Sequence, residues 1–184
     1  MSTVPRIAAS TLREAFAMQP DLFEGFWDLY GTLWMEGRLD HATKEVARLR
    51  NARVTGCGYC KQVRFSVARE QGLSESTAAM VDEGYGESGL SERHKAAVAF
   101  ADRFLALPGT PRPTWTGAES NGTESNGTES GESAAALDAD ERIELAVALA
   151  MFMGFAKMLI TLGLEPTDMP ITLVATPGSE SQRT

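Results

Sequence analysis

The spacing of apolar residues predicts helices along almost the whole chain. Apolar side chains recur every three or four residues, and no segment shows the sustained alternation that is typical of strands. The clearest stripe is aromatic and follows Asp21, which with Glu24 is predicted to cap a helix. Its members are Phe23, Phe26, Trp27, Tyr30, Leu33 and Trp34. Such a stripe is typical of a core or a subunit interface, although it could also wall a substrate pocket.

Further helices are predicted from capping and stop signals. Asp40 is predicted to cap one helix, and Asp138 with Glu141 is predicted to cap another. Between these two, helices are predicted from near Cys57 to Gln71, over 74–81 and over 91–107. The sequence therefore predicts an all-α fold.

The last predicted helix is apolar on all sides between Leu145 and Ala156. This apolar run is too short for a bilayer, which needs about 20 residues. A helix that is apolar all round must be buried all round, and packing against another subunit achieves this most easily in a chain of this size. We therefore expect a homo-oligomer.

Residues 109–133 differ in kind from the rest of the chain. The sequence Ser-Asn-Gly-Thr-Glu at 120–124 repeats at 125–129, within a tract that is polar, acidic and rich in glycine. Because such a tract buries little apolar surface, we expect a disordered insertion there. The segment from about residue 166 is rich in Pro, Ser and Thr and is expected to form a flexible tail. The whole chain, 1–184, is expected to be a single domain.

The amino-acid composition and the net charge limit the kinds of binding partner that are expected. The chain has 17 basic and 25 acidic residues, a net charge of −8, and no basic patch, so neither nucleic acid nor a membrane is expected as a partner. The N-terminal residues are not followed by an apolar run of signal-peptide length. We expect a cytoplasmic protein.

The two cysteines of the chain, Cys57 and Cys60, stand together as Gly-Cys-Gly-Tyr-Cys where a loop is predicted to enter a helix. The N–H groups and the dipole at a helix N-terminus stabilise a thiolate, and a second thiol one turn away can close a disulfide. In a reducing compartment such a pair favours catalysis, redox sensing or metal binding over a structural cross-link. Two ordinary neighbouring thiols are the alternative.

Three other residues are candidates for the same site. If the helices before and after the cysteines pack as an antiparallel hairpin, Glu45 returns toward the thiols, where burial would suit it to proton transfer near neutral pH. His41 lies one turn before Glu45, and Arg64 lies four residues after Cys60, where its charge would favour the Cys60 thiolate. Each of the three could instead belong to a solvated helix face.

A zinc site is a weaker alternative. A closed site needs four ligands, and only His41 and His94 are available beside the two thiols, at no familiar spacing. The motifs of serine hydrolases and of phosphate-binding loops are absent from the sequence. We expect neither a metal nor a cofactor.

One arrangement of residues resembles a known family. Glu45, eleven intervening residues, the Cys57 to Cys60 motif and a polar residue four positions later resemble the alkylhydroperoxidase D-like branch of the carboxymuconolactone decarboxylase superfamily. The sequence at 49–57, Leu-Arg-Asn-Ala-Arg-Val-Thr-Gly-Cys, is also similar to the segment that precedes the redox motif in that family. The resemblance covers about residues 40–107 well and residues 141–163 more loosely.

The resemblance implies an all-α helical bundle, assembled as a homo-oligomer that is often a trimer or a hexamer. It implies that Cys60 attacks a hydroperoxide to give a sulfenic acid, that Cys57 resolves it to a disulfide, and that Glu45 serves the proton relay. The oxidant would be a hydroperoxide or a disulfide, and the reductant a protein or a small thiol of unknown identity. The family motif has His where this chain has Arg64, which leaves the relay incomplete unless His41 or water replaces it.

Two other functions remain open at the level of sequence. One is a redox-sensing or structural homo-oligomer of the same fold, without peroxidase turnover. The other is a carboxymuconolactone decarboxylase-like enzyme acting on a small organic acid, which the cysteine pair disfavours.

Overall fold

A computed structural model describes residues 4–106, 137–166 and 168–179. In chain order its elements are α1 (Leu12–Ala17), α2 (Pro20–Met35), α3 (His41–Thr55), α4 (Gly58–Gln62), β1 (Val63–Phe65), α5 (Ser66–Glu70), α6 (Glu75–Ala79), the 3-10 turn η1 (Tyr85–Glu87), α7 (Glu92–Leu105), α8 (Ala139–Leu162) and β2 (Thr172–Val174). The prediction of an all-α fold is confirmed, with a small sheet added to it.

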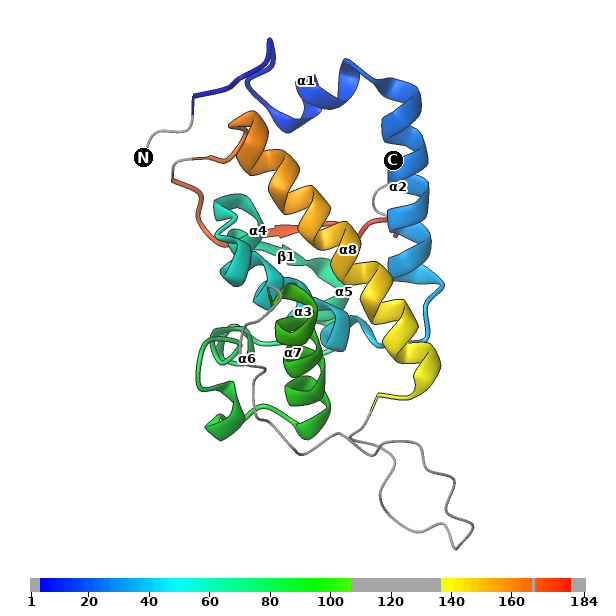
Figure 1. Cartoon of the computed structure of the whole chain (residues 1–184), viewed down its shortest axis with the longest axis vertical. Coiled ribbons are helices and arrows are strands. Elements are labelled where there is room, and N and C mark those ends of the chain that lie inside the picture. The colour runs from blue at the N-terminus through cyan, green and yellow to red at the C-terminus, as the bar shows by residue number, and fades with distance from the viewer. Residues whose placement is uncertain (1–3, 107–136, 167, 180–184) are drawn as a thin grey trace, which may run out of the picture.

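Helix α3 lies at the centre of the molecule. Helices α7 and α8 both pack against it, and Figure 1 shows α8 crossing α3 obliquely with α2 at its side. The core between them is formed by apolar side chains of these four helices, among them Leu33, Trp34, Val46, Leu49, Ala97, Val98, Leu145, Leu149 and Phe152. Because α3 is covered on several sides, even its polar residues Lys44, Glu45 and Asn51 are almost completely buried.

Several predicted caps are confirmed. The Asp40 carboxylate accepts the N–H of Thr43 at the start of α3. Asp138 and Glu141 form a reciprocal capping box at the start of α8. The predicted cap at Asp21 is wrong, since α2 begins one residue earlier, at Pro20. Proline suits the first turn of a helix because its fixed φ is already helical and it has no N–H to leave unpaired.

The helix predicted from Cys57 to Gln71 is broken in the middle. Residues 63–65 are extended and pair in parallel with 172–174, so that β1 separates α4 from α5. Buried side chains of α3 compensate backbone groups that a helix would have satisfied. Arg48 donates to the carbonyl of Val63, and Glu45 accepts the N–H of Phe65. These long-range partners make the interruption possible and are invisible to local periodicity.

Residues 168–179 differ from the flexible tail expected from composition. They run back across the molecule, form β2 and bury Thr176, whose hydroxyl accepts the N–H of Val67. Pairing with β1 and this side-chain bond give an order that a Pro-, Ser- and Thr-rich composition does not predict. The insertion expected at 109–133 lies outside the described residues.

Helix α8 is, by length and composition, able to cross a membrane, and it is the one helix of the described residues with this property. The helix spans 24 residues, whereas the apolar run from Leu145 to Ala156, which was judged too short for a bilayer, is only part of it. Its Leu145, Leu149 and Phe152 side chains pack in the core against α3, whereas Ile143 and Val147 on the same helix are exposed, so α8 is not buried on all sides in the single chain.

Candidate functional site

The two cysteines form a disulfide at the N-terminus of α4. Helix α3 ends at Gly56, whose left-handed backbone (φ 78°) turns the chain sharply, and Cys57 then becomes the N-cap of α4. The Cα atoms of Cys57 and Cys60 are 5.3 Å apart, within the range that a disulfide spans. The Cys60 N–H also donates to the Cys57 sulfur over 3.2 Å. Both residues are buried, Cys57 completely and Cys60 to all but 6% of its surface.

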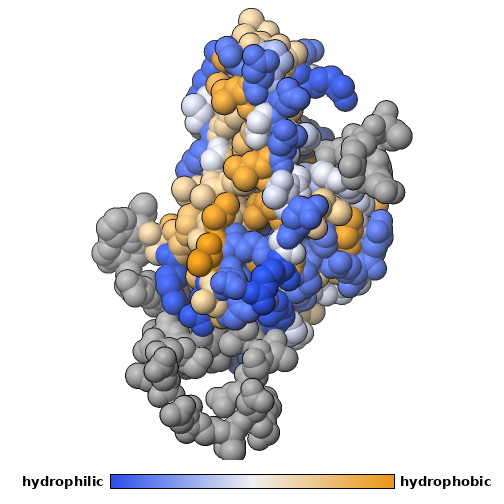
Figure 2. All heavy atoms as spheres, turned by 90° about the vertical axis from the view of Figure 1, so that its right-hand side faces the viewer, coloured by the Kyte–Doolittle hydropathy of each residue, from blue (hydrophilic) through white to orange (hydrophobic). Residues whose placement is uncertain are grey.

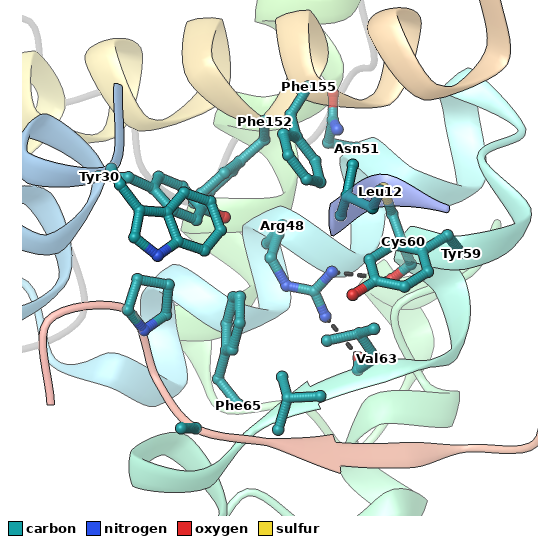
Figure 3. A pocket seen from close by; sticks show the side chains of 14 residues that line it. Leu12, Tyr30, Arg48, Asn51, Tyr59, Cys60, Val63, Phe65, Phe152 and Phe155 are labelled. Atoms are coloured by element: carbon teal, nitrogen blue, oxygen red, sulfur yellow. Dashed lines mark hydrogen bonds between the residues drawn. The ribbon is translucent and has the colours of Figure 1, made fainter. Parts of the chain in front are cut away.

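Arg48 and Glu45 form a buried ion pair beside the disulfide. The Arg48 Nε and Nη2 atoms each lie 2.7 Å from a different oxygen of Glu45. The same guanidinium donates to the carbonyls of Cys60, at 2.8 Å, and Val63, at 2.7 Å. Figure 3 shows these two bonds directed at the chain segment that carries Cys60. Arg48 therefore links the carboxylate of α3 to the redox motif.

A cavity of about 160 Å³ opens next to this pair. Cys60 lines it and Cys57 does not. Its walls are largely aromatic, from α2 and α8 as well as from β1, and Figure 3 shows how they surround Arg48. The lining residues are Leu12, Trp27, Tyr30, Arg48, Asn51, Tyr59, Cys60, Val63, Phe65, Phe152, Phe155, Val174, Ala175 and Pro177. The cavity is suited to a small, mainly apolar molecule that touches Cys60.

The polar groups on the cavity wall differ in their protonation and partners. Burial raises the pKa of the Tyr59 hydroxyl, although the Arg48 charge opposes this, and it raises the pKa of Tyr30 strongly. Both hydroxyls are therefore neutral donors near neutral pH. Burial alone would lower the pKa of Arg48, but the charge and hydrogen bonds of Glu45 raise it above its usual value. The buried Oδ1 of Asn51 has no hydrogen-bond partner within the part of the chain that the structure describes.

Of the predicted site residues, the structure brings Glu45 to the cysteine segment, but through Arg48. Both Glu45 oxygens are engaged by the guanidinium. Direct proton transfer between Glu45 and a thiol stays a prediction. The chain after the cysteines does return antiparallel to α3, but as α4 and β1 rather than as one long helix.

Arg64 and His41 have other partners than the thiols. The Arg64 guanidinium pairs with Glu75 and donates to the carbonyls of Lys61 and Val63. His41 begins α3, seven residues before Arg48, or about 10 Å along the helix axis at ~1.5 Å per residue. Its ring stacks on Trp34, and burial together with the Lys44 charge lowers its pKa. The structure does not show either side chain in contact with a sulfur.

The sequence analysis missed three residues that the structure places at or near the pair. Arg48 lies one turn after Glu45 on the same helix face, and this i, i+3 spacing of opposite charges could have indicated it. Asn51 lies one further turn along that face. Glu165 accepts the Gly58 N–H from 107 positions away, and no local pattern could have indicated this contact.

Within the described ranges, no three His, Cys, Asp or Glu side chains lie close enough together to hold a metal ion. His41 and His94, the nitrogen donors of the zinc alternative, stand at the first turns of α3 and α7 respectively.

Comparison with known proteins supports the resemblance seen in the sequence. No curated protein and no solved structure matches the chain. The family model of the Carboxymuconolactone decarboxylase family matches residues 20–103, which include α2 through most of α7 and the whole Cys57 to Cys60 motif. Residues 20–103 of the chain are therefore similar to the Carboxymuconolactone decarboxylase family.

Proposed function

We propose that this protein is a thiol-dependent oxidoreductase that reduces small organic hydroperoxides by cycling Cys57 and Cys60 between dithiol and disulfide. One observation carries the proposal: a cysteine pair in disulfide contact stands at the edge of a largely aromatic cavity, and only Cys60 lines that cavity. A substrate in the cavity would therefore meet Cys60 first. Cys60 is the attacking thiol and Cys57 the resolving thiol.

The proposed cycle has three steps. The Cys60 thiolate attacks the terminal oxygen of the hydroperoxide, the O–O bond breaks, and an alkoxide leaves as Cys60 becomes a sulfenic acid. The Cys57 sulfur then displaces the sulfenic hydroxyl, which leaves as water with the Cys57 proton, and the disulfide forms. An external dithiol, or two molecules of a monothiol, returns both cysteines to thiols and is itself oxidised to a disulfide.

Arg48 supports the first step electrostatically. Its guanidinium lines the cavity and donates to the Cys60 carbonyl, so its positive charge lies close to where the thiolate forms and the alkoxide departs. Glu45 holds this guanidinium in place through two hydrogen bonds. In this proposal Arg48 takes the electrostatic role that the sequence analysis gave to Arg64.

The reductant is proposed to be a protein dithiol or a small thiol of the cytoplasm, where such reductants keep cysteines reduced. A sensor that is oxidised once, without repeated turnover, is the competing function for the same pair. The two differ in whether one protein molecule consumes many equivalents of hydroperoxide.

Decarboxylation of a small organic acid is the weaker proposal. A dicarboxylic lactone would need a cationic group to bind it. Among the described residues on the cavity wall, Arg48 is the one charged side chain, so the wall offers one positive charge for the two carboxylates of such a substrate. The remaining wall is apolar or neutral, which favours an uncharged substrate.

The test is reductant-dependent consumption of cumene hydroperoxide by the full-length protein. Cys60→Ser should abolish turnover, and Cys57→Ser should permit at most a single equivalent of reduction. His94→Gln provides a matched control outside the cavity and should retain activity. Equal consumption by the parent protein and Cys60→Ser would refute the proposal.

We further propose that the protein assembles as a homo-oligomer through the outer faces of α2 and α8. Large apolar side chains are exposed there, including Leu22 with 73% and Ile143 with 66% of their surface. Figure 2 shows hydrophobic residues gathered along the side of the molecule on which α2 lies. An apolar cavity of about 500 Å³ between α1, α2 and α8 continues this surface. Light scattering should give the mass of a trimer or hexamer, and Ile143→Glu with Val147→Glu should lower it, while a monomeric parent would contradict the proposal.

A further inference from the structure

The cysteine pair has charges of opposite sign at its two ends. At Cys60, the Arg48 guanidinium donates to the backbone carbonyl. Next to Cys57, the carboxylate of Glu165 accepts the N–H of Gly58, with 2.5 Å between nitrogen and oxygen. Gly58 directly follows Cys57 and is the first residue of α4. The positive charge of Arg48 thus lies on the Cys60 side of the pair, and the negative charge of Glu165 lies on the Cys57 side.

Glu165 is held in this place by the end of α8. The helix stops at Gly163, which adopts a left-handed conformation (φ 69°), and the Leu164 N–H donates to the carbonyl of Leu159. Leu164 packs in one apolar cluster with both cysteines. The turn at Gly163 and Leu164 therefore places the Glu165 carboxylate next to the start of α4. Glu165 also lies on the wall of a separate cavity of about 430 Å³, together with Tyr59.

The Cys60 N–H donates to the Cys57 sulfur, a contact that favours a thiolate there and that the Glu165 charge would oppose, and the other surroundings of Cys57 are mostly apolar. Cys57 packs with Ala52, Ala156 and Leu159, among others, from α3 and α8. The elements around the pair carry other titratable and charged groups. Helix α3 carries His41, Lys44, Glu45, Arg48, Arg50 and Arg53, α4 carries Tyr59 and Lys61, β1 carries Arg64, α8 carries Asp140, Glu141, Arg142, Glu144 and Lys157, and the segments that flank the helices add Arg6 and Glu165. Among the described residues, Glu165 is the carboxylate with a direct hydrogen bond to the Cys57–Cys60 turn. The apolar neighbours of Cys57 screen a nearby charge less than water does.

We propose that Glu165 is a positioning residue of the redox pair: it fixes the turn through Gly58 and keeps Cys57 protonated, so that the thiolate forms at Cys60. This inference rests on the proposed function and assigns the order of the two thiols to a residue outside the family segment. A negative charge disfavours a second one nearby, so Cys57 remains a thiol until resolution, when its proton leaves with the departing water. The same carboxylate disfavours the reduced pair, with its single negative charge on Cys60, relative to the uncharged disulfide, which keeps the pair reducing.

The test compares the parent protein with Glu165→Gln, which keeps a hydrogen-bond acceptor but removes the charge. Cysteine Cβ chemical shifts of the reduced full-length protein are followed by NMR from about pH 5 to about pH 10, a range that covers perturbed and ordinary thiols. In Glu165→Gln the Cys57 thiol should titrate at lower pH, with a smaller change at Cys60. The disulfide exchange equilibrium with glutathione should shift toward the dithiol by about threefold to tenfold, or ~15 to ~30 mV.

Three further variants separate charge from structure. Glu165→Ala removes the same charge by another route and should shift both readouts in the same direction. Glu165→Asp keeps the charge and should stay close to the parent. Asp168→Asn removes a charge from the same segment, at an exposed residue, and should change neither readout.

The outcomes distinguish this inference from the proposed function. Unchanged titration and unchanged exchange in both Glu165→Gln and Glu165→Ala would overturn the role of Glu165, as would an equal shift in Asp168→Asn. Failure of the parent protein to exchange with glutathione, or to reduce hydroperoxide, would instead overturn the proposed function.

Discussion

The ion pair between Glu45 and Arg48 should be essential to the fold, and Arg48→Met tests this. Methionine preserves much of the side-chain volume but removes four hydrogen bonds, two to Glu45 and two to the carbonyls of Cys60 and Val63. The carboxylate that remains has no exposed surface. Leaving such a charge buried and unpaired costs about 3–5 kcal/mol, and each carbonyl left without a donor adds roughly 1 kcal/mol or more.

The assay is urea unfolding of the oxidised protein at one protein concentration. With a denaturant slope of about 2 kcal/mol/M, a total loss of about 5–7 kcal/mol should lower the midpoint by about 2.5–3.5 M. In the double variant Glu45→Gln with Arg48→Met, part of the loss should be recovered. A loss below about 1 kcal/mol for Arg48→Met would refute the reasoning, since surface ion pairs contribute that little.

Three further substitutions test the packing and the helix ends by thermal or urea unfolding. Phe152→Ala opens a void in the core beside the cavity and should cost about 3–5 kcal/mol, whereas a cost below ~1 kcal/mol would contradict its placement. Asp40→Ala removes the cap of α3 and should cost about 1 kcal/mol at pH 7. Although burial opposes it, hydrogen bonds to Thr43 and Arg93 lower the pKa of Asp40 in the folded protein, so its stabilisation is present above pH ~4 and is lost as pH falls below that value. A difference from the parent that grows on acidification would contradict this. Gly163→Ala should cost about 1 kcal/mol or more, because φ is 69° and the new Cβ meets the Val4 carbonyl; a neutral or stabilising effect would contradict the described turn.

The helical class and most helix starts were predictable from sequence because their causes are local. Asp40, Ser74, Ser91 and Asp138 each accept a backbone N–H three residues later, as a capping residue must. The redox motif was equally visible, since its two cysteines stand one turn apart.

The environment of the motif was predictable only in part, since distant residues create it. Glu45 was singled out, but its partner Arg48 was not. Strand β1 depends on pairing with residues more than 100 positions away, and so does the contact of Glu165 with Gly58. Arg64 lies one helical turn from Cys60 only if the helix continues; because the chain is extended there, its guanidinium pairs with Glu75 instead.

The order of the two thiols is the central claim, and trapping of the sulfenic acid tests it most directly. Reduced Cys57→Ser and Cys60→Ser proteins are each treated with one equivalent of cumene hydroperoxide and a dimedone probe, and labelling is read by mass spectrometry. Cys60 should be labelled in Cys57→Ser, whereas Cys57 should remain unlabelled in Cys60→Ser. Labelling of Cys57 at an equal or faster rate, or no labelling in either variant, would contradict the claim that hydroperoxide reacts at Cys60.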